Sequence, residues 1–597
     1  MKTCLLRGAW AALAALSLAL PLSPAWASEA EPAQRKALHA LFDRHWDWST
    51  QASPEFASYR GDHRFGDRLS DVSQAAQDER EQTIRRFAEQ ARALQVDRLG
   101  STDRLSLALF IDMQQRQLEQ AAFPGARGMS LRALGGPQTK FAELLQIMPM
   151  QSAAQVEQML SRMAAYPRRM EQEIAQLRRS AALGWVPARP VLERVLAQID
   201  AQLLAPEAAP HYQPFKRLGQ GIAPDQAQAL RERGLQAVAT QVLPALRQLR
   251  ALVSDELMAK APADGALRNY PDGAKVYAMA VRHRTSTDMT PAQIHAIGLR
   301  ELARLRSEME AVMKETRFDG SFERFVEFIN TDERFFHKGP EALLAGYRDI
   351  AKRLDAEMPR LFAELPRAPY GIRSMPAHMG ANRAESYNGP AIDGSRAGFF
   401  FANTLAWRSR PIWGMETLVA HETMPGHHMQ VARATELLGL PNFRRSGFGY
   451  TAFSEGWALY AETLGTELGL FTDPYSKFGH LQWQAFRAAR LVVDTGIHEL
   501  GWSRQRAIDF MVERTGTGRE FVASEVDRYA SDPAQALAYM IGKLKFDELR
   551  DRAKAGLGAR FDIRRFHNAV LDNGAVSLSA LERLIDDWIL AQAGAPG

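Results

Sequence analysis

The densest group of possible metal ligands in this sequence lies at residues 421–428, which read HETMPGHH. Histidine nitrogens and carboxylate oxygens bind zinc, and in one class of zinc peptidases a glutamate directly after the first histidine ligand is the general base. The segment therefore predicts a zinc site with His421 as a ligand. Glu422 is predicted to take the proton of a zinc-bound water.

The spacing of the histidines departs from the usual pattern, in which the second ligand follows the first by four residues. Pro425 occupies that position. On a straight helix His428 would return to the face of His421, but about 10 Å further along the axis, too far to share one ion. Pro425 must interrupt the helix. If two residues loop out, His427 takes the place of the second ligand, so we favour His427 and keep His428 as the alternative.

A third ligand is predicted in the helical segment at residues 454–462. Glu455 and Glu462 are seven residues apart and therefore share one helical face. Gly456 beside Glu455 would allow two helices to approach closely. Glu455 is our predicted ligand, and Glu462 could instead orient a histidine ligand from outside.

Amide hydrolysis at this site would also need a donor to the developing oxyanion. Candidate donors lie in the C-terminal part of the chain, at Arg490, His498, Arg528, Tyr529 and Tyr539. A second set of side chains could bind a substrate carboxylate, namely Arg396, Arg490, Gln535 and Lys543. Such binding would make the protein a carboxypeptidase or a dipeptidyl carboxypeptidase, and the sequence does not choose between them.

The elements that must position these residues are mostly helices. Apolar residues recur at three- and four-residue spacing in several long segments, at 78–94, 153–177, 191–203, 225–253 and 291–313. Thr290-Pro291 is a helix start with Thr as N-cap. Residues 398–404 are the one convincing strand, either an edge strand against which a peptide could pair or an ordinary buried strand.

Together these patterns predict a mainly α-helical protein with a small antiparallel sheet near residue 400. A soft division near residue 280 separates an N-terminal helical half, residues 28–280, from a catalytic half, residues 281–597. We expect the two halves to form one compact domain.

The first 27 residues have the pattern of a secretory signal peptide. Lys2 and Arg7 precede an apolar stretch at residues 9–20, and Ala25-Trp26-Ala27 is a small-x-small cleavage pattern. The apolar stretch is shorter than the roughly 20 residues that span a bilayer. We therefore expect cleavage near Ala27, no membrane anchor, and a periplasmic or secreted product.

Composition excludes several other classes of protein. The chain has 597 residues, 46% hydrophobic and 24% charged, which is typical of a globular protein. The formal charge of +5 is spread along the chain without a dense basic block, which argues against nucleic-acid binding. Cys4, the one cysteine, lies in the predicted signal, so the mature protein has no disulfide.

Longer motifs resemble the bacterial family known as domain of unknown function 885. The resemblance rests on segments 421–428 and 455–460, on Tyr387-Asn388-Gly389-Pro390 with residues 393–396, and on earlier pieces at 61–67 and 290–299. It covers nearly the whole mature chain. That family is in turn distantly similar to helical zinc peptidases of the neurolysin, angiotensin-converting enzyme and carboxypeptidase Taq type.

The resemblance implies a zincin-like helical fold with a deep central channel, a zinc cofactor and a peptide substrate. By similarity to the helical peptidases, Tyr539 is the first choice of oxyanion donor and His498 the second. Two alternatives stay open: a metal-dependent hydrolase of a non-peptide amide or ester, and a non-catalytic periplasmic peptide-binding protein on a peptidase scaffold. The oligomeric state is not predicted.

Overall fold

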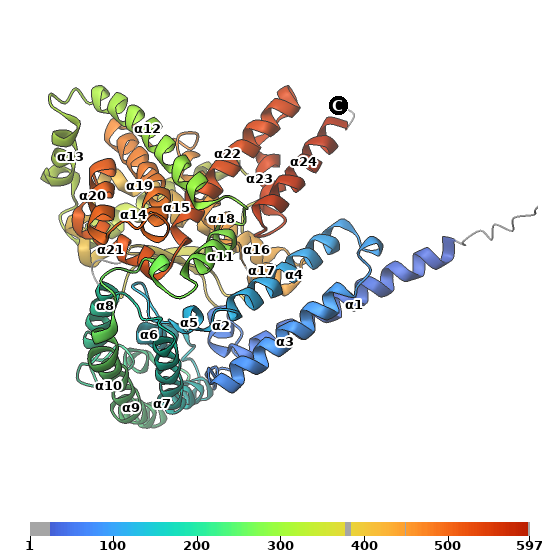
Figure 1. The fold of residues 1–597 in the computed structure, drawn as a ribbon, viewed down its shortest axis with the longest axis vertical. Coiled ribbons are helices and arrows are strands. Elements are labelled where there is room, and N and C mark those ends of the chain that lie inside the picture. Colours follow the sequence, from blue (N-terminus) through green and yellow to red (C-terminus); the bar gives the residue numbers. More distant parts are fainter. Residues whose placement is uncertain (1–23, 377–383, 448, 595–597) are drawn as a thin grey trace, which may run out of the picture.

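The computed structural model describes residues 24–376, 384–447 and 449–594, and most of them lie in helices (Figure 1). The helices of the first half are α1 Pro24–Ala52, α2 Pro54–Tyr59, α3 Gln74–Arg92, α4 Ser101–Ala121, α5 Pro124–Gly128, α6 Pro137–Ile147, α7 Ala153–Ala182, α8 Arg189–Asp200, α9 Pro224–Ala237, α10 Leu243–Ala251 and α11 Gly273–Thr285. The helices of the second half are α12 Pro291–Glu315, α13 Phe322–Thr331, α14 Pro340–Glu357, α15 Met415–Glu422, α16 His427–Glu436, α17 Asn442–Ser446, α18 Thr451–Thr463, α19 Pro474–His498, α20 Arg504–Thr515, α21 Arg519–Ser531, α22 Ala538–Leu557, α23 Ile563–Leu571 and α24 Leu578–Gly594.

Several helices begin where the sequence predicts a cap. The Thr290 side chain accepts a hydrogen bond from the Gln293 amide, and the Gln293 side chain accepts one from the Thr290 amide, which completes a capping box at the start of α12. Ser152 and Gln155 form the same arrangement at α7. The predicted helix at 225–253 is interrupted at residues 238–242, where a π-helical turn separates α9 from α10.

A small sheet lies between the helices, and its topology differs from the prediction. The strands β1 Tyr370–Ser374, β2 Ser386–Asn388 and β3 Gly398–Ala402 are arranged in the order β1-β3-β2. β3 runs parallel to β1 and antiparallel to β2, so the sheet is mixed and not antiparallel. The aromatic strand β3 is the central strand because the chain returns to a place between β1 and β2. It pairs with a neighbouring strand along both of its edges. β2 is an edge strand of this sheet.

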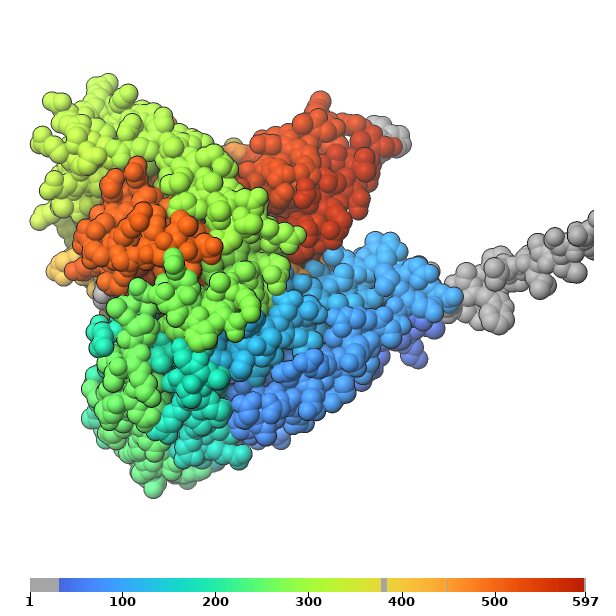
Figure 2. All heavy atoms as spheres, viewed as in Figure 1, coloured from blue at the N-terminus to red at the C-terminus, as the bar shows by residue number. Residues whose placement is uncertain are grey.

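Three hydrophobic cores hold the helices together. The buried residues of one core all lie between residues 131 and 257, mainly in α6 to α10, and Tyr59 and Leu69 pack against it. Another joins α1, α3 and α4 to α14, α15, α18 and α22 to α24, so it spans both halves of the chain. The third packs α12 against α19 to α21. In the space-filling view a notch separates the red C-terminal helices from the light-green α12 (Figure 2).

Most of the predicted signal peptide lies outside the described residues. Helix α1 begins at Pro24, just before the predicted cleavage point. Within the part of the chain that the structure describes, no helix combines the length and apolar character needed to cross a bilayer.

Candidate metal centre

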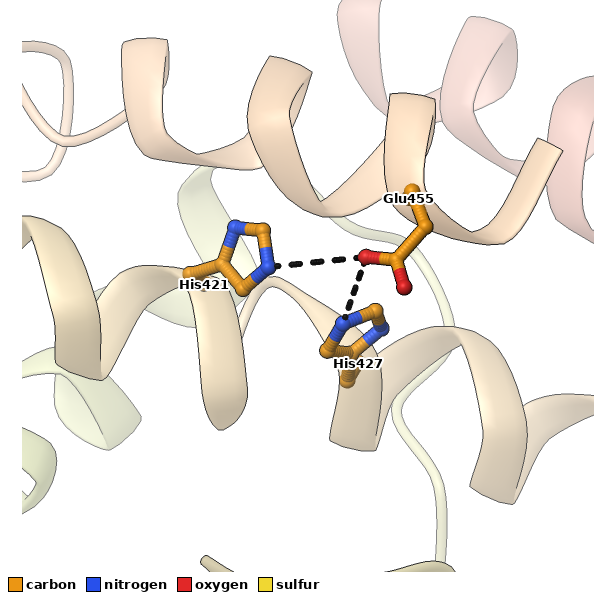
Figure 3. Close-up of side chains that lie close together, drawn as sticks. All are labelled: His421, His427 and Glu455. Carbon is orange, nitrogen blue, oxygen red and sulfur yellow. Dashed lines mark ion pairs between the residues drawn. The ribbon is translucent and has the colours of Figure 1, made fainter. Parts of the chain in front are cut away.

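Three side chains from three helices meet in the C-terminal half (Figure 3). His421 lies near the end of α15, His427 at the start of α16 and Glu455 on α18. One ligand atom from each lies within 4.8 Å of the others. The Glu455 carboxylate is 3.3 Å from Nε2 of His427 and 3.7 Å from Nε2 of His421. The structure therefore brings together the three residues that the sequence singles out as ligands, and it makes a donor set of two imidazoles and one carboxylate.

The loop between the two histidines replaces a continuous helix. Helix α15 ends at Glu422 and α16 begins at His427, so residues 423–426 form a bulge. Gly426 is required in this bulge because a Cβ there would lie 1.9 Å from the carbonyl oxygen of His421. The indole nitrogen of Trp457 on α18 donates a hydrogen bond of 3.0 Å to the Pro425 carbonyl. The bulge is thus held between the end of its own helix and the helix that carries Glu455.

Helix α18 is in backbone contact with α22. A Cβ on Gly456 would lie 2.5 Å from Cα of Gly542, and a Cβ on Gly542 would lie 2.0 Å from the Ala452 carbonyl oxygen. Two glycines therefore allow an approach that other residues would prevent. Gly456 does permit close packing, but the partner is α22, which carries Tyr539.

Glu462 orients His421 from the side away from Glu455. It is fully buried, and its carboxylate accepts a 2.8 Å hydrogen bond from Nδ1 of His421. Its second oxygen accepts a 3.0 Å hydrogen bond from Gln484, and Arg487 lies 3.7 Å from the first. This arrangement leaves Nε2 of His421 to face Glu455, as in carboxylate–histidine pairs that support metal ions.

His428 faces away from the cluster. Its Nε2 lies 3.0 Å from the Ala368 carbonyl, which can only accept, so this nitrogen carries the proton. Nδ1 then accepts the hydroxyl proton of Tyr387 at 2.8 Å. Burial lowers the pKa of His428 to about 4. Both ring nitrogens are engaged, so the geometry places His427 and not His428 beside His421.

Glu455 and Glu422 have different electrostatic surroundings. Burial alone would raise the pKa of Glu455, but His427 and His421 hold it well below the usual range, so this carboxylate stays ionised. Burial raises the pKa of Glu422, Glu455 and Glu385 act in the same direction, and the two histidines oppose them. Glu422 is adjacent to the cluster but does not belong to the donor set.

Tyr539, the first choice of oxyanion donor in the sequence analysis, lies against the cluster. Its ring stacks on that of His421 with 6.3 Å between centroids and 15° between planes. Its hydroxyl accepts hydrogen bonds from Arg528 at 3.0 Å and from Gln535 at 3.3 Å. Because both neighbours donate, the proton of the Tyr539 hydroxyl is free to be given to another acceptor.

A buried group of charges surrounds Tyr539. Arg490 lies 4.5 Å from the centre of its ring and donates to Glu525 at 2.6 Å. Burial opposes ionisation of Glu525, yet Arg528 and Arg490 hold its pKa at about 2. The Tyr539 side chain is therefore held in place by a buried group of charged residues, namely Arg528, Arg490 and Glu525.

His498 has a structural environment instead of the catalytic one considered for it. Nδ1 accepts a 3.1 Å hydrogen bond from the Leu267 amide, and Nε2 lies 3.0 Å from the Tyr529 carbonyl. Burial lowers its pKa to about 4. With both nitrogens used by backbone groups, His498 has no N–H for an oxyanion.

Sequence reasoning gave no role to three residues that the structure places around the cluster. Tyr387 stacks on His427 with 6.4 Å between ring centroids, and Arg487 and Gln484 contact Glu462. Tyr387 stands in a motif that supports the family resemblance, and that motif was its only signal. The two residues of α19 have no local signal, because their partner lies on another helix.

Comparisons with known proteins agree with this architecture but give no activity. A crystal structure from Colwellia psychrerythraea, described as a "putative lipoprotein", is similar with a TM-score of 0.87 and 27% identity, over 94% of this chain and 99% of that one. A Shewanella oneidensis structure, also described as a "putative lipoprotein" and of unknown function, has a TM-score of 0.68 at 17% identity, over 91% and 98%. No curated protein matches the chain. The model of the family described as bacterial protein of unknown function (DUF885) matches residues 54–585, so the chain belongs to this family.

Proposed function

We propose that this protein is an exported zinc-dependent metallopeptidase. The observation that carries the proposal is the convergence of His421, His427 and Glu455 within 4.8 Å, with Glu422 beside them. Two histidines and one glutamate are the ligands of several catalytic zinc sites, which keep a further position for water.

The residues fit a metal ion on two further observations. Oε2 of Glu455 is buried and faces the two imidazole nitrogens at 3.3 and 3.7 Å, but it accepts no well-aligned hydrogen bond among the described residues. A buried carboxylate oxygen without a hydrogen bond is costly, and a cation between it and the two imidazoles would remove that cost. Glu462 holds His421 in the tautomer that a metal ligand needs.

The chemistry of the proposal divides among named side chains. When bound, zinc lowers the pKa of a water and polarises a carbonyl group. Glu422 accepts the proton of the attacking water and returns it to the leaving amine. Tyr539 donates its hydroxyl proton in a hydrogen bond to the developing oxyanion, since Arg528 and Gln535 already donate to its oxygen. Tyr387 is a weaker candidate for the oxyanion donor because its hydroxyl already donates its proton to His428.

Export and peptide specificity rest on other observations. The signal pattern at residues 1–27 is the ground for export, and two similar structures are described as lipoproteins. The peptide substrate rests on the resemblance to helical zinc peptidases and on the edge strand β2, which adjoins the cluster through Tyr387.

The test is metal content and hydrolysis in the mature protein, purified without chelator or nickel. We expect about one zinc per chain by mass spectrometry, lost in His421→Ala and kept in His428→Ala. Random-sequence peptides should be cut by the wild type, and Glu422→Gln should bind zinc yet lose at least about 100-fold in rate. Zinc binding without peptide hydrolysis, beside turnover of another amide or ester, would favour a different hydrolase. Peptide binding without zinc would favour a binding protein.

A further inference from the structure

A cavity of about 730 Å³ lies beside the candidate metal centre. One wall comes from β2 and α16 and includes Tyr387, Gly389 and Val431. The opposite wall comes from α2, α6 and α7 of the N-terminal half. The volume is in the range of cavities that bury most of a small ligand.

The cavity adjoins the chemistry through two of its lining residues. Tyr387 lines it and stacks on His427. Val431 lies one turn after His427 on α16, about 6 Å along the helix axis. The cavity therefore lies on the His427 side of the metal centre. A molecule that fills it extends from this side away from the centre.

The far wall includes an apolar patch beside its charged residues. It contains Leu69, Phe141, Leu144 and Met170. The Tyr166 ring stacks on Phe141 at 4.0 Å between centroids. The Tyr166 hydroxyl is buried and has no hydrogen-bond partner among the residues that the structure describes. These side chains would accept bulky apolar groups and offer one hydroxyl to a polar atom of the ligand.

Positive charge on the lining is incompletely neutralised. Arg169 is paired with Glu55 and Glu173, and Lys140 with Glu143. Three other lining arginines donate only to uncharged oxygen atoms: Arg60 to the Thr50 hydroxyl, Arg396 to the carbonyls of Gly389 and Tyr59, and Arg445 to the Thr435 carbonyl and the Asn442 amide oxygen. No carboxylate of the described residues is within ion-pair distance of these three arginines. A ligand that suits this cavity is apolar and carries a negative charge.

We propose that this cavity binds the C-terminal segment of the substrate, with apolar side chains against Phe141 and Tyr166 and the free α-carboxylate at Arg60, Arg396 and Arg445. This inference rests on the proposed peptidase function and makes the protein specific for free peptide C-termini. The edge strand β2 supports a peptide as the occupant, because Asn388 belongs to this strand and lines the cavity.

The first experiment compares two pools of random-sequence hexapeptides, one with free carboxylates and one amidated, on zinc-loaded protein by mass spectrometry. We expect the acids to be cut about 10- to 100-fold faster, as for loss of a hydrogen-bonded charge, with a preference for bulky apolar residues near the C-terminus. Arg445→Met should lower the rate on the acids about 10-fold and leave the amides unchanged. Leu69→Trp, which fills the cavity, should abolish the apolar preference.

Matched controls are Arg64→Met, an exposed arginine paired with Asp62 and Asp47, and Leu500→Trp, an exposed leucine far along the chain. Both should behave as the wild type. Equal rates on acids and amides would overturn the inference while leaving a peptidase. An Arg445→Met effect of equal size on both pools would also overturn the inference. The arginine would then stabilise the fold or bind an anion from solution instead of the peptide carboxylate.

A binding measurement separates this inference from the proposed function. N-acetyl-Ala-Ala-Phe as the acid and as the amide would be titrated into the protein by calorimetry. We expect the acid to bind at least 10-fold more tightly, and Arg445→Met to remove the difference. If the protein cuts no peptide yet shows this difference, the cavity assignment stands and the peptidase function fails. If acid and amide bind alike, the cavity assignment fails.

Discussion

Replacing Glu462 with glutamine tests whether His421 is a metal ligand, because the change removes one charge and keeps the shape of the side chain. The carboxylate accepts from His421 at 2.8 Å and from Gln484 at 3.0 Å. A glutamine can still accept from His421 but then presents an amide to Gln484. The oxygen of Gln484 has no hydrogen-bond partner within the described part of the chain, so this side chain can turn and the hydrogen bonds can be kept. The main loss is therefore the negative charge beside the imidazole.

The expected size follows from known effects of such outer partners. Their loss costs about 10- to 100-fold in metal affinity, or about 1.4 to 2.7 kcal/mol. Competition of zinc between the protein and a chromophoric chelator measures this directly. Glu467→Gln is the control, because Glu467 pairs with Arg550 at 2.6 Å on the surface and should leave the affinity unchanged.

One result would refute the reasoning, and a second would call for another variant. Wild-type zinc affinity in Glu462→Gln would mean that His421 does not bind the ion through Nε2. A loss of folding, seen as a large fall in the urea midpoint without zinc, would mean that the pair of Glu462 with Arg487 stabilises the fold and that the affinity cannot be compared. In that case Gln484→Glu replaces the amide donor to Glu462 with a second carboxyl group, which raises the pKa of Glu462 by like-charge repulsion and should weaken zinc binding through His421.

Three further predictions concern the bulge, the oxyanion donor and a buried acid. Gly426→Ala places a Cβ against the His421 carbonyl and should cost about 3 kcal/mol in unfolding free energy and most of the zinc affinity, by urea titration and chelator competition. Tyr539→Phe keeps the ring and should lower kcat about 100-fold at unchanged zinc content, by steady-state kinetics. Burial raises the pKa of Asp494 to about 7, although Tyr277 and the Ala534 amide donate to it. Its ionisation therefore opposes folding, and stability should fall by about 2 to 3 kcal/mol between pH 5 and pH 8, a loss that Asp494→Asn should remove in urea titrations at both pH values.

Each of these has its own contrary result. Gly439 has open space around it, so Gly439→Ala should leave zinc binding intact, and equal losses in both glycine variants would remove the argument for the bulge. A Tyr539→Phe enzyme with normal kcat would assign the oxyanion to another donor. An unchanged pH dependence in Asp494→Asn would mean that this carboxyl titrates near its ordinary pKa in the folded protein.

The sequence predicted the local parts of this structure well. The helix start at Thr290 and the break at Pro425 follow from residues a few positions apart, and the structure contains them. The helical periodicity also placed Glu455 and Glu462 on one face of α18. Local chemistry is sufficient for such features because capping and proline effects act within one turn.

Long-range contacts were not predictable from the sequence. The choice between His427 and His428 depends on Tyr387 and the Ala368 carbonyl, which occupy both nitrogens of His428 from distant parts of the chain. The prediction of an antiparallel sheet was wrong for the same reason, because the parallel pairing of β1 with β3 is set by how the chain crosses between them. His498 was a catalytic candidate in the sequence analysis because its burial cannot be recognised from the neighbouring residues. In the structure it is a packing residue whose two ring nitrogens contact backbone groups.

The contiguous core at residues 131–257 has a consequence for how the molecule opens. Segments that pack mainly within themselves can unfold or shift as one cooperative unit at a lower free energy than the whole protein. The α6 and α7 part of the far wall belongs to this unit, whereas His421, His427 and Glu455 lie on α15, α16 and α18, which contribute to another core. Sub-global opening would therefore admit a long molecule to the cavity without loosening the helices that carry His421, His427 and Glu455. A bound molecule would slow amide exchange in α6 and α7 more than in α15 and α18.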